Sequence, residues 1–588
     1  MLFRRWLLLA LPLLATSARG APPPPDQFLP NNTVAALMTT DAAGFVKAWE
    51  KTEFSALGRE PLLQPFIQDV DAQWRRGLVL FDQLGLNWED LKGMASGPAG
   101  VAVLRPAPDR VVLVGVVDTT GTGRARNLVV AKIARNVLRH GGTAKQQTVL
   151  KFPVTVFSLP APGSSHAVSL CLYTREDLLI LADDISAVEA VLSRWDRGHD
   201  SLADAKSYQE VRKRSAFADG RPVHLTLFAD PAGMVEARHI WAPPKKPGPD
   251  ILTMLGEEGF VGIQAVGATV RLNDGPFDQL ARASVYAPPP YTRAMAAMNF
   301  PNHQLAGPEP WVPADLARCV TFTWDTRDLL TAIGFLFDRV THKPGDFTAI
   351  VEALRDDPDG PRVDLQRQVL GRLTGKVTLV SDCPAEVPDR GERALLAFEA
   401  RDDKGLADAV GRLLEGEEGV TRHPTKPAYW NIAIKPTKLK GGTTTGRANL
   451  AVAVSGGRLL VANQAGLLAK VLAGPAAPLA KSADFLAVDA QLRKLAPAES
   501  SFRIFARPAE VLRGPYVLTQ SDRLGGAGGL TARLLRGGLH QLNVKPDAGK
   551  LPPYDKVGRY LTPLGAAVVT APNHDGWDAV GFLLKAPR

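Results

Sequence analysis

Serine patterns are the first place where this sequence could support chemistry. A nucleophilic serine needs a strained Gly-x-Ser-x-Gly turn, or a lysine three residues after it, so that a base can activate the hydroxyl. No serine in the chain has either neighbourhood. The nearest pattern is Ser455-Gly456-Gly457. It follows two apolar residues, and we predict a hairpin turn there between strands at 450–454 and 459–461.

Two glycine-rich segments could approach a phosphate group. Gly121-Thr122-Gly123 follows an apolar run and precedes a predicted helix at 125–138, but the third glycine of a dinucleotide-binding loop is absent. Residues 441–447 have the glycine spacing of a P-loop and lack its Lys-Ser/Thr pair. We predict a strand-to-helix turn at the first segment, a flexible hairpin loop at the second, and no bound cofactor.

Possible metal ligands are spread along the chain without a recognisable spacing. The ten histidines form no His-Glu-x-x-His motif, and Cys171, Cys319 and Cys383 form no Cys-x-x-Cys pair. Cys171 and Cys319 lie in apolar strand-like runs, where a thiol acts as a small apolar group. A disulfide between two of the three cysteines stays open at this point, because spacing does not establish pairing.

One acidic stretch resembles a calcium loop. Asp357, Asp359 and Gly360 could fill positions three, five and six of an EF-hand loop, but Arg355 and Gln366 stand at positions one and twelve, which need acidic ligands. We predict an Asp-Pro-Asp-Gly turn before a helix, and no metal site. A calcium-dependent envelope protein remains a third hypothesis for function.

The sequence identifies no catalytic residue. Paired carboxylates for glycoside hydrolysis would have to meet in space, and 60 acidic residues offer too many pairs to choose from. Asp183-Asp184 is predicted to cap a helix. Trp195, Trp241 and Trp430 are isolated tryptophans, which are more typical of the edges of apolar cores than of a sugar-binding surface.

Composition limits the class of protein. Of 588 residues, 45% are apolar and 22% are charged, which excludes a disordered chain, a collagen-like fibre and a multi-span membrane protein. Three cysteines exclude a scaffold built on disulfides. The 69 basic and 60 acidic residues give a formal net charge of +9, but they are interleaved, so we expect no nucleic-acid partner.

The N-terminus has the order of a secretory signal peptide. The pair Arg4-Arg5 precedes an apolar run at 6–14, and small residues stand at Ala18 and Gly20. The apolar run is shorter than the roughly 20 residues that span a bilayer. We predict a signal peptide at 1–20 with cleavage near Gly20-Ala21. The mature chain would then be periplasmic or extracellular and carry no transmembrane helix.

Two parts of the chain repeat each other. Leu202-Ala203 matches Leu479-Ala480, and the phrase Leu-Phe-Ala-Asp-Pro-Ala at 227–232 matches Ile-Phe-Ala-Arg-Pro-Ala at 504–509. From Leu202 to Pro231 the offset is constant at 277 residues (479 − 202 and 508 − 231). A chance similarity would not keep that register, so we predict a tandem internal duplication.

Each repeat is predicted to have an α+β fold of antiparallel strands joined by polar turns, with the helices covering one face of the sheet. Near the start of each repeat, a strand-like run ends at an aspartate, Asp41 or Asp325, which we expect to cap the next helix. The predicted organisation is a signal peptide at 1–20, a Pro-rich linker at 21–30, a first repeat at 31–242, a connecting β-containing segment at 243–316, a second repeat at 317–514 and a C-terminal β-containing segment at 515–588.

Several phrases in the chain are similar to those of an uncharacterised family of large, exported, repeat-built bacterial proteins. The resemblance covers most of the mature chain and implies location and fold, but no active site. The phrases that carry it are Trp311-Val312-Pro313-Ala314-Asp315, Trp324-Asp325, Asp356-Asp357-Pro358-Asp359-Gly360-Pro361, Val363-Asp364-Leu365, and the Leu-Ala pairs at Leu202 and Leu479.

Taken together, the sequence predicts an exported, non-enzymatic protein that has a binding or structural role in the periplasm or cell envelope. Its partner would be an envelope protein or a small ligand. The alternative is a hydrolase or other enzyme whose residues meet only in the folded chain. A pocket with converging carboxylates or histidines in one half would favour the enzyme.

Overall fold

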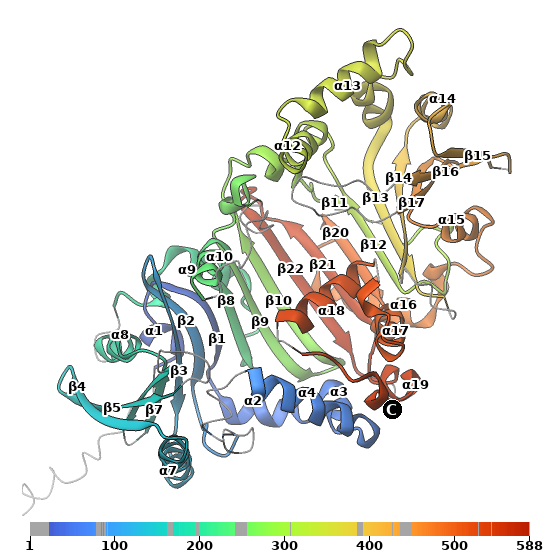
Figure 1. The fold of residues 1–588 in the computed structure, drawn as a ribbon. Helices are drawn as coiled ribbons and strands as arrows, with labels where there is room; N and C mark the ends of the chain where they lie inside the picture. Colours follow the sequence, from blue (N-terminus) through green and yellow to red (C-terminus); the bar gives the residue numbers. More distant parts are fainter. Residues whose placement is uncertain are drawn as a thin grey trace, which may run out of the picture.

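Short apolar runs separated by polar turns fold into one long antiparallel sheet, as the computed structural model shows (Figure 1). Helices between the runs pack against the sheet and make the protein α+β. The structure describes residues 23–586 apart from 78–83, 85, 87–89, 91, 161–167, 176, 196–198, 242–253, 255, 306, 385–391, 426, 435–447, 527–528 and 542–543.

The helices (α), strands (β) and short helical turns (η) alternate along the whole described chain. Up to residue 286 they are α1 (Pro25–Phe28), β1 (Thr33–Thr39), α2 (Ala42–Trp49), α3 (Glu53–Gly58), η1 (Pro61–Leu63), α4 (Gln64–Gly77), β2 (Ala99–Ala107), β3 (Arg110–Asp118), α7 (Gly123–Arg139), β4 (Thr143–Val149), β5 (Phe152–Leu159), β6 (Val168–Arg175), β7 (Leu178–Ala182), α8 (Ile185–Trp195), η2 (Leu202–Asp204), α9 (Lys206–Arg214), β8 (Leu225–Ala229), α10 (Pro231–Trp241), η3 (Phe260–Gly262), β9 (Ala265–Asp274) and β10 (Phe277–Tyr286). From residue 293 they are η4 (Arg293–Ala297), β11 (His303–Gln304), β12 (Arg318–Thr323), α12 (Leu329–Thr341), α13 (Asp346–Asp356), η5 (Leu365–Val369), η6 (Leu370–Arg372), β13 (Leu373–Asp382), β14 (Arg393–Ala400), α14 (Asp403–Leu414), β15 (Val420–His423), β16 (Tyr429–Ile434), β17 (Ala448–Val454), β18 (Arg458–Ala462), α15 (Ala465–Leu472), η7 (Leu479–Lys481), α16 (Ala483–Leu495), β19 (Glu499–Ser500), β20 (Phe502–Ala506), α17 (Pro508–Gln520), η8 (Leu524–Gly526), α18 (Leu530–Gln541), η9 (Ala548–Lys550), α19 (Tyr554–Gly558), β21 (Leu564–Thr570) and β22 (Gly576–Leu584).

The strands of the long sheet pair in one continuous order, and every pair is antiparallel. The order is β4-β5-β6-β7-β3-β2-β1-β8-β9-β10 and then β22-β21-β20-β12-β13-β14-β18-β17-β16-β15. The second series of ten strands repeats the order of the first in reverse, with β12 in the place of β1 and β22 in the place of β10. The two series meet where β10 pairs with β22 (Figure 1).

Element positions follow the offset found in the sequence. η2 and η7, α9 and α16, β8 and β20, and α10 and α17 each begin 277 residues apart (479 − 202, 483 − 206, 502 − 225 and 508 − 231). The segment predicted to connect the repeats, 243–316, supplies β9 and β10, which extend the sheet from β8. The predicted C-terminal segment supplies β21 and β22, which extend it in the same way from β20.

Helices cover both faces of the sheet, and the expectation that they cover one face is wrong. On β7, Ile180 packs in one core cluster with Val191 of α8, whereas the next residue, Leu179, packs in another with Ile133 of α7. Neighbouring strand residues point to opposite faces, so α8 and α7 define two faces, which we call the α8 face and the α7 face. The physical reason is that β7 is apolar at every position rather than at alternate ones.

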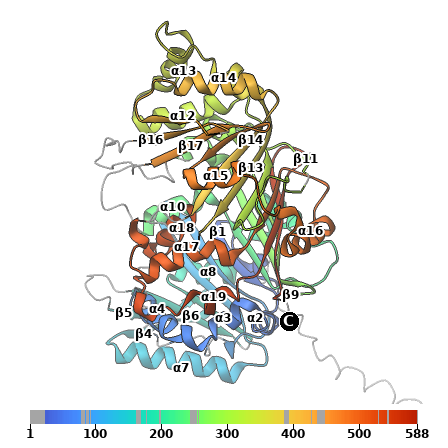
Figure 2. The same cartoon turned by 90° about the vertical axis from the view of Figure 1, so that its right-hand side faces the viewer.

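The two halves also hold each other through their helices. From the second half, Lys550 Nζ lies 2.6 Å from Asp69 of α4 in the first half, and the Tyr560 hydroxyl donates to Glu60 of the first half at 2.8 Å. Arg339 of α12, in the second half, also forms an ion pair with Glu257, which precedes β9 of the first half. Figure 2 shows α16 on one side of the sheet and α17 and α18 on the other. Among the described residues, no helix has the length and apolar character needed to cross a membrane.

Candidate functional site

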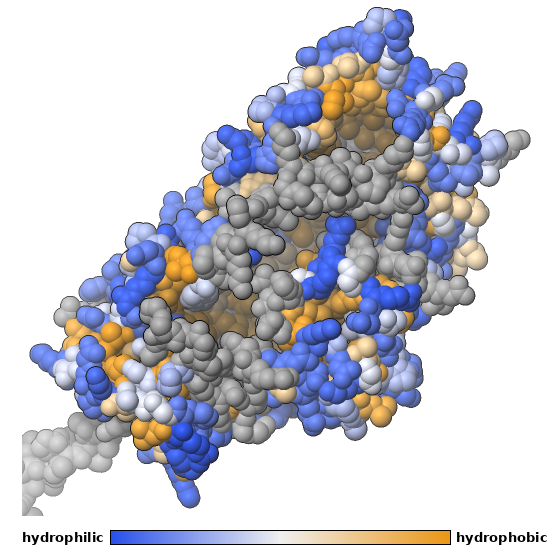
Figure 3. Space-filling view, viewed as in Figure 1, coloured by the Kyte–Doolittle hydropathy of each residue, from blue (hydrophilic) through white to orange (hydrophobic). Residues whose placement is uncertain are grey.

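Among the described residues, no helix covers one part of the α7 face, and there the sheet forms the floor of a cavity. Leu37 on β1, Val101 on β2 and Leu113 on β3 keep 47%, 51% and 39% of their surface exposed, although they lie in the middle of a sheet. The cavity has a volume of about 510 Å³, which is in the range of about 300–1,000 Å³ typical of small-molecule sites. Figure 3 shows a hollow over β1 that is lined by apolar residues.

The walls of the cavity come from α2 and from the segment before β2. Phe45 and Val46 extend from α2, and Leu84, Leu86 and Met94 lie in the segment that leads into β2. The full set of described residues that line it is Leu37, Met38, Thr39, Ala42, Phe45, Val46, Leu84, Leu86, Lys92, Met94, Ala95, Ala99, Gly100, Val101, Leu113, Gly115, Val116, Val117, Leu170, Leu181, Ala182, Asp183 and Leu225.

The sequence after β1 places α2 beside the floor. Asp41 breaks the strand and caps α2, because its carboxylate accepts from the Gly44 backbone N–H at 2.8 Å. A Cβ on residue 44 would lie 2.2 Å from Asp41 Oδ2, so the close capping contact requires glycine there. The predicted cap at Asp41 is therefore confirmed, and it fixes the direction in which Phe45 and Val46 extend.

Helix α7 closes the other side of the cavity. Its Val129, Ile133 and Val137 are buried in one cluster with Leu84, Leu86 and Met94 of the cavity wall. The same cluster contains Phe157, Leu159, Leu170 and Leu172, so α7 sits over β5 and β6. Between α7 and α2, the strip across β1, β2 and β3 keeps Leu37, Val101 and Leu113 partly exposed.

Three polar side chains line the cavity in the part of the chain that the structure describes, and all three make contacts of their own. Lys92 forms an ion pair with Glu50. Asp183 accepts from the Leu113 backbone N–H at 2.8 Å, and Thr39 Oγ1 accepts from the Asp41 backbone N–H at 3.1 Å. Burial raises the pKa of the Asp183 carboxyl above its ordinary value. The cavity is therefore suited to an apolar group and offers no paired acid and base.

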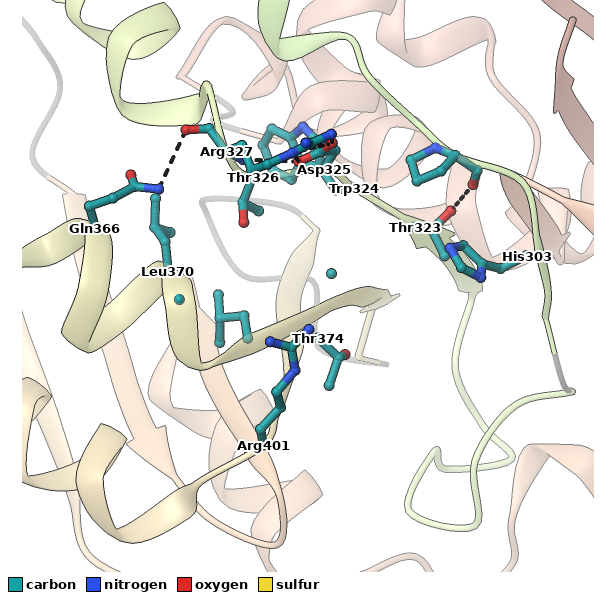
Figure 4. A pocket seen from close by; sticks show the side chains of 14 residues that line it. His303, Thr323, Trp324, Asp325, Thr326, Arg327, Gln366, Leu370, Thr374 and Arg401 are labelled. Carbon is teal, nitrogen blue, oxygen red and sulfur yellow. Dashed lines mark hydrogen bonds and ion pairs between the residues drawn. The ribbon is translucent and has the colours of Figure 1, made fainter. Parts of the chain in front are cut away.

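A second pocket, in the other half, is polar and has a volume of about 310 Å³ (Figure 4). In Figure 4, Asp325 and Arg327 lie across the pocket from Arg401, and His303 lies on the side away from Gln366. The Arg327 guanidinium bonds both oxygens of Asp325 at 2.9–3.0 Å and holds the pKa of that carboxyl below its usual value. A carboxylate so paired is a poor general base at neutral pH.

The predicted cap at Asp325 is wrong. α12 begins at Leu329 after Asp328, which makes no side-chain capping bond, and Asp325 instead accepts from the Arg327 backbone N–H at 3.1 Å. Three residues separate Asp325 from the helix, which is too far for a side chain to reach the first turn. Sequence similarity between the two strand ends therefore does not extend to the helix start.

The three cysteines are free in the structure and line neither pocket. Cys171 and Cys319 are buried and Cys383 is partly buried. Burial raises the pKa of the Cys171 thiol to about 11, of Cys319 to about 12 and of Cys383 to about 11, so all three are protonated at neutral pH. The disulfide left open by the sequence is not formed here.

The turn predictions hold where the structure describes them. Gly121 lies in the turn between β3 and α7 with a φ of +76°, and Gly456 and Gly457, between β17 and β18, have φ values of +58° and +74°. Asp357 makes a turn after α13, where it accepts from the Asp359 backbone N–H at 3.0 Å. The segment 441–447 lies outside the described residues. Within the described residues, no group of three or more His, Cys, Asp or Glu could hold a metal ion.

The remaining predicted residues have structural roles. Asp184 caps α8 through Ser186 at 2.8 Å, as expected, whereas Asp183 turns to β3 and the cavity. Trp195 stacks on Phe28 with ring centroids 5.1 Å apart, Trp430 packs beside a core cluster, and Trp241 is 48% exposed. The cavity residues Leu37, Val101 and Leu113 were not predicted from the sequence. An exposed apolar residue in a strand has the same sequence pattern as a buried one.

Comparison with known proteins adds one weak similarity. The sequence matches no family model and no curated protein. Among solved structures, the chain is similar to one described as "Structure of crystal form III of TP0453", with 11% sequence identity and a TM-score of 0.23, over 48% of this chain and 89% of that chain.

Proposed function

We propose that this is an exported, non-enzymatic protein that binds an apolar ligand in the cavity of its first half. The observation that carries the proposal is the lining of that cavity, where three polar side chains stand among an otherwise apolar set of described residues. Apolar pockets of this size with few polar groups are the usual form of small-molecule sites. The ligand is a small molecule rather than a nucleic acid.

The exposed floor supports binding on energetic grounds. Leaving Leu37, Val101 and Leu113 in contact with water costs about 25 cal/mol for each Å² of apolar surface, which a bound apolar ligand would recover. Contiguous apolar surface rimmed by polar residues is rare on monomeric proteins unless it is used. A ligand that covers this strip would complete the packing of the α7 face.

Export and duplication are part of the same proposal. Export is inferred from Arg4-Arg5, the apolar run at 6–14 and the small residues Ala18 and Gly20. Duplication is inferred from the constant offset of 277 residues in the sequence, and the matching strand order of the two series supports it. A duplicated scaffold in the periplasm or envelope could carry different binding sites on its two halves.

The alternative, a hydrolase or other enzyme, would have to use the polar pocket of the second half. That pocket brings together one carboxylate, Asp325, and one imidazole, His303. Because Asp325 is already paired with Arg327, the carboxylate is unsuited to activating a nucleophile. We therefore rank binding above catalysis. Turnover of any substrate by the purified protein in a panel of esters, glycosides and phosphates would reverse that order.

The experiment for the binding proposal is a titration with N-phenyl-1-naphthylamine, an uncharged probe that fluoresces in apolar sites. We expect saturable binding to the purified protein. The variant Val101→Lys should lose it, because a charge placed on the cavity floor must be desolvated when the probe enters. The matched control is Leu128→Lys on α7, where the residue is 65% exposed and does not line the cavity.

Each outcome of this titration decides the question. Loss of fluorescence in Val101→Lys and retention in Leu128→Lys supports the cavity as the site. Absence of saturable binding to the wild type, or equal binding by the two variants, removes the proposal. Both altered residues are exposed, so neither variant is expected to unfold the chain.

A further inference from the structure

We propose that the ligand is a single unbranched acyl chain lying across the strands, and that Gly115 is the residue that makes room for it. This inference rests on the proposed function and specifies the ligand class and the determinant of the same cavity. Three features of the cavity carry it: its length across the strands, the hydrogen bonds already made around it, and the missing side chain at the centre of its floor.

The cavity extends across the strands of the sheet. Its lining extends from Leu225 on β8, across β1, β2, β3 and β7, to Leu170 on β6, which are six neighbouring strands of the sheet. With strands about 4.8 Å apart, this span is about 24 Å. One extended hydrocarbon chain can follow this whole span, whereas a compact fused-ring system would cover only part of it.

A polypeptide is a poor occupant of this cavity. Each buried backbone N–H and C=O needs a hydrogen-bond partner, and the described polar side chains of the lining, Thr39, Lys92 and Asp183, already have partners. The floor strands β1, β2 and β3 are each paired on both sides, so no strand edge is open for a peptide to extend the sheet. A hydrocarbon chain has no polar groups to satisfy.

Gly115 opens the middle of the floor. It lies on β3 between Val101 of β2 and Leu181 of β7, and all three line the cavity. A Cβ on residue 115 would have one heavy-atom neighbour within 4 Å, the Leu181 carbonyl oxygen at 3.9 Å. Residue 115 is also not among those with a positive φ. A side chain would therefore fit there without strain and would project into the cavity.

The second half has a leucine at the corresponding place. In its matching row of strands, Leu379 of β13 pairs with Leu396 of β14, and Leu396 pairs with Val461 of β18. Leu396 thus takes the position that Gly115 takes in the first half. At the centre of this row, the first half has no side chain and the second half has a leucine. We infer that acyl-chain binding belongs to the first half.

The test is a graded series at one position, with the fluorescent fatty acid cis-parinaric acid as the probe. The variants are Gly115→Ala and Gly115→Leu, and the control is Gly58→Leu, at an exposed helical glycine with nothing within 4 Å of its Cβ and no place in the cavity. A leucine side chain displaces about four carbons of ligand, and each buried methylene is worth about fourfold in affinity, so Gly115→Leu should weaken binding about 250-fold. Gly115→Ala should weaken it about fourfold.

Displacement of the probe defines the ligand class. Octanoate, laurate and palmitate should displace it with increasing strength, and pyrene should not. Palmitate and lysophosphatidylcholine share the acyl chain and differ in the head group, so comparing them distinguishes a free fatty acid from a membrane lipid as its source. Equal displacement by pyrene and palmitate would overturn the assignment of an unbranched chain.

The outcomes separate this inference from the proposed function. If wild type binds neither cis-parinaric acid nor N-phenyl-1-naphthylamine, the proposed function fails. If wild type binds and Gly115→Leu binds equally well, the proposed function stands and the role of Gly115 is wrong. Gly115→Leu should unfold at a denaturant concentration no lower than that of the wild type, which distinguishes a filled cavity from a misfolded chain.

Discussion

Replacing Ile133 with alanine tests whether α7 is docked on the sheet as the structure has it. Ile133 is 0% exposed and packs beside Leu179, Leu170 and Met94. The substitution removes three carbons, and at about 0.8 kcal/mol for each buried methylene the transfer cost is about 2.4 kcal/mol. The cavity left behind adds to this, so we expect a loss of about 3 kcal/mol in the free energy of unfolding.

The assay is urea unfolding of the full chain, followed by far-ultraviolet circular dichroism. Leu128→Ala is the control, because Leu128 lies on the same helix and is 65% exposed. Its effect should stay within about 0.5 kcal/mol. If Ile133→Ala lost no more stability than Leu128→Ala, α7 would not bury this face of the sheet. The position of α7 beside the cavity would then be refuted as well.

Three further predictions follow from other sites. Burial raises the Asp183 pKa above its ordinary 3.8, so the folded state holds that proton to higher pH than the unfolded chain does. The contribution of Asp183 to the free energy of unfolding therefore falls as pH rises above that value. In denaturant titrations, Asp183→Asn should be more stable than wild type at neutral pH and no more stable below pH 4. Native protein should react slowly with a thiol reagent and denatured protein should react at Cys171, Cys319 and Cys383, whereas rapid labelling of the native protein would contradict the raised thiol pKa values. N-terminal sequencing of protein recovered from the periplasm of an expression host should begin near Ala21, and a retained Met1 would refute the signal peptide.

Much of the scaffold could be predicted from the sequence, because turn chemistry and apolar runs are local signals. The turns at Gly121 and at Gly456-Gly457 are set by their glycines, and the cap at Asp41 is set by one side chain. The constant offset also marked pairs of elements such as β8 and β20 correctly. Asp325 shows the limit of this reasoning, since a matching residue type did not produce a matching cap.

The arrangement in space was harder to predict. The order in which strands pair is a long-range property, so the sequence did not show that β10 would join β22. An apolar strand can be covered on one face or on both, and the expectation of a single covered face failed because the run at β7 fits either case. The cavity depends on the gap between α2 and α7, and the local sequence of Leu37 or Val101 carries no signal for that gap.

The two faces of the sheet place different constraints on the two halves. On the α8 face, side chains such as Val114 in the first half and Leu395 in the second are buried at 0% and 1% exposure, so a change in size there costs packing energy. On the α7 face, an uncovered floor position can change size at little cost to stability, because the space beside it is open. Gly115 occupies such a position, and Leu396 is its counterpart in the corresponding row of the second half. Under the proposed duplication and binding function, a single side chain at the centre of the floor would decide which half binds the ligand.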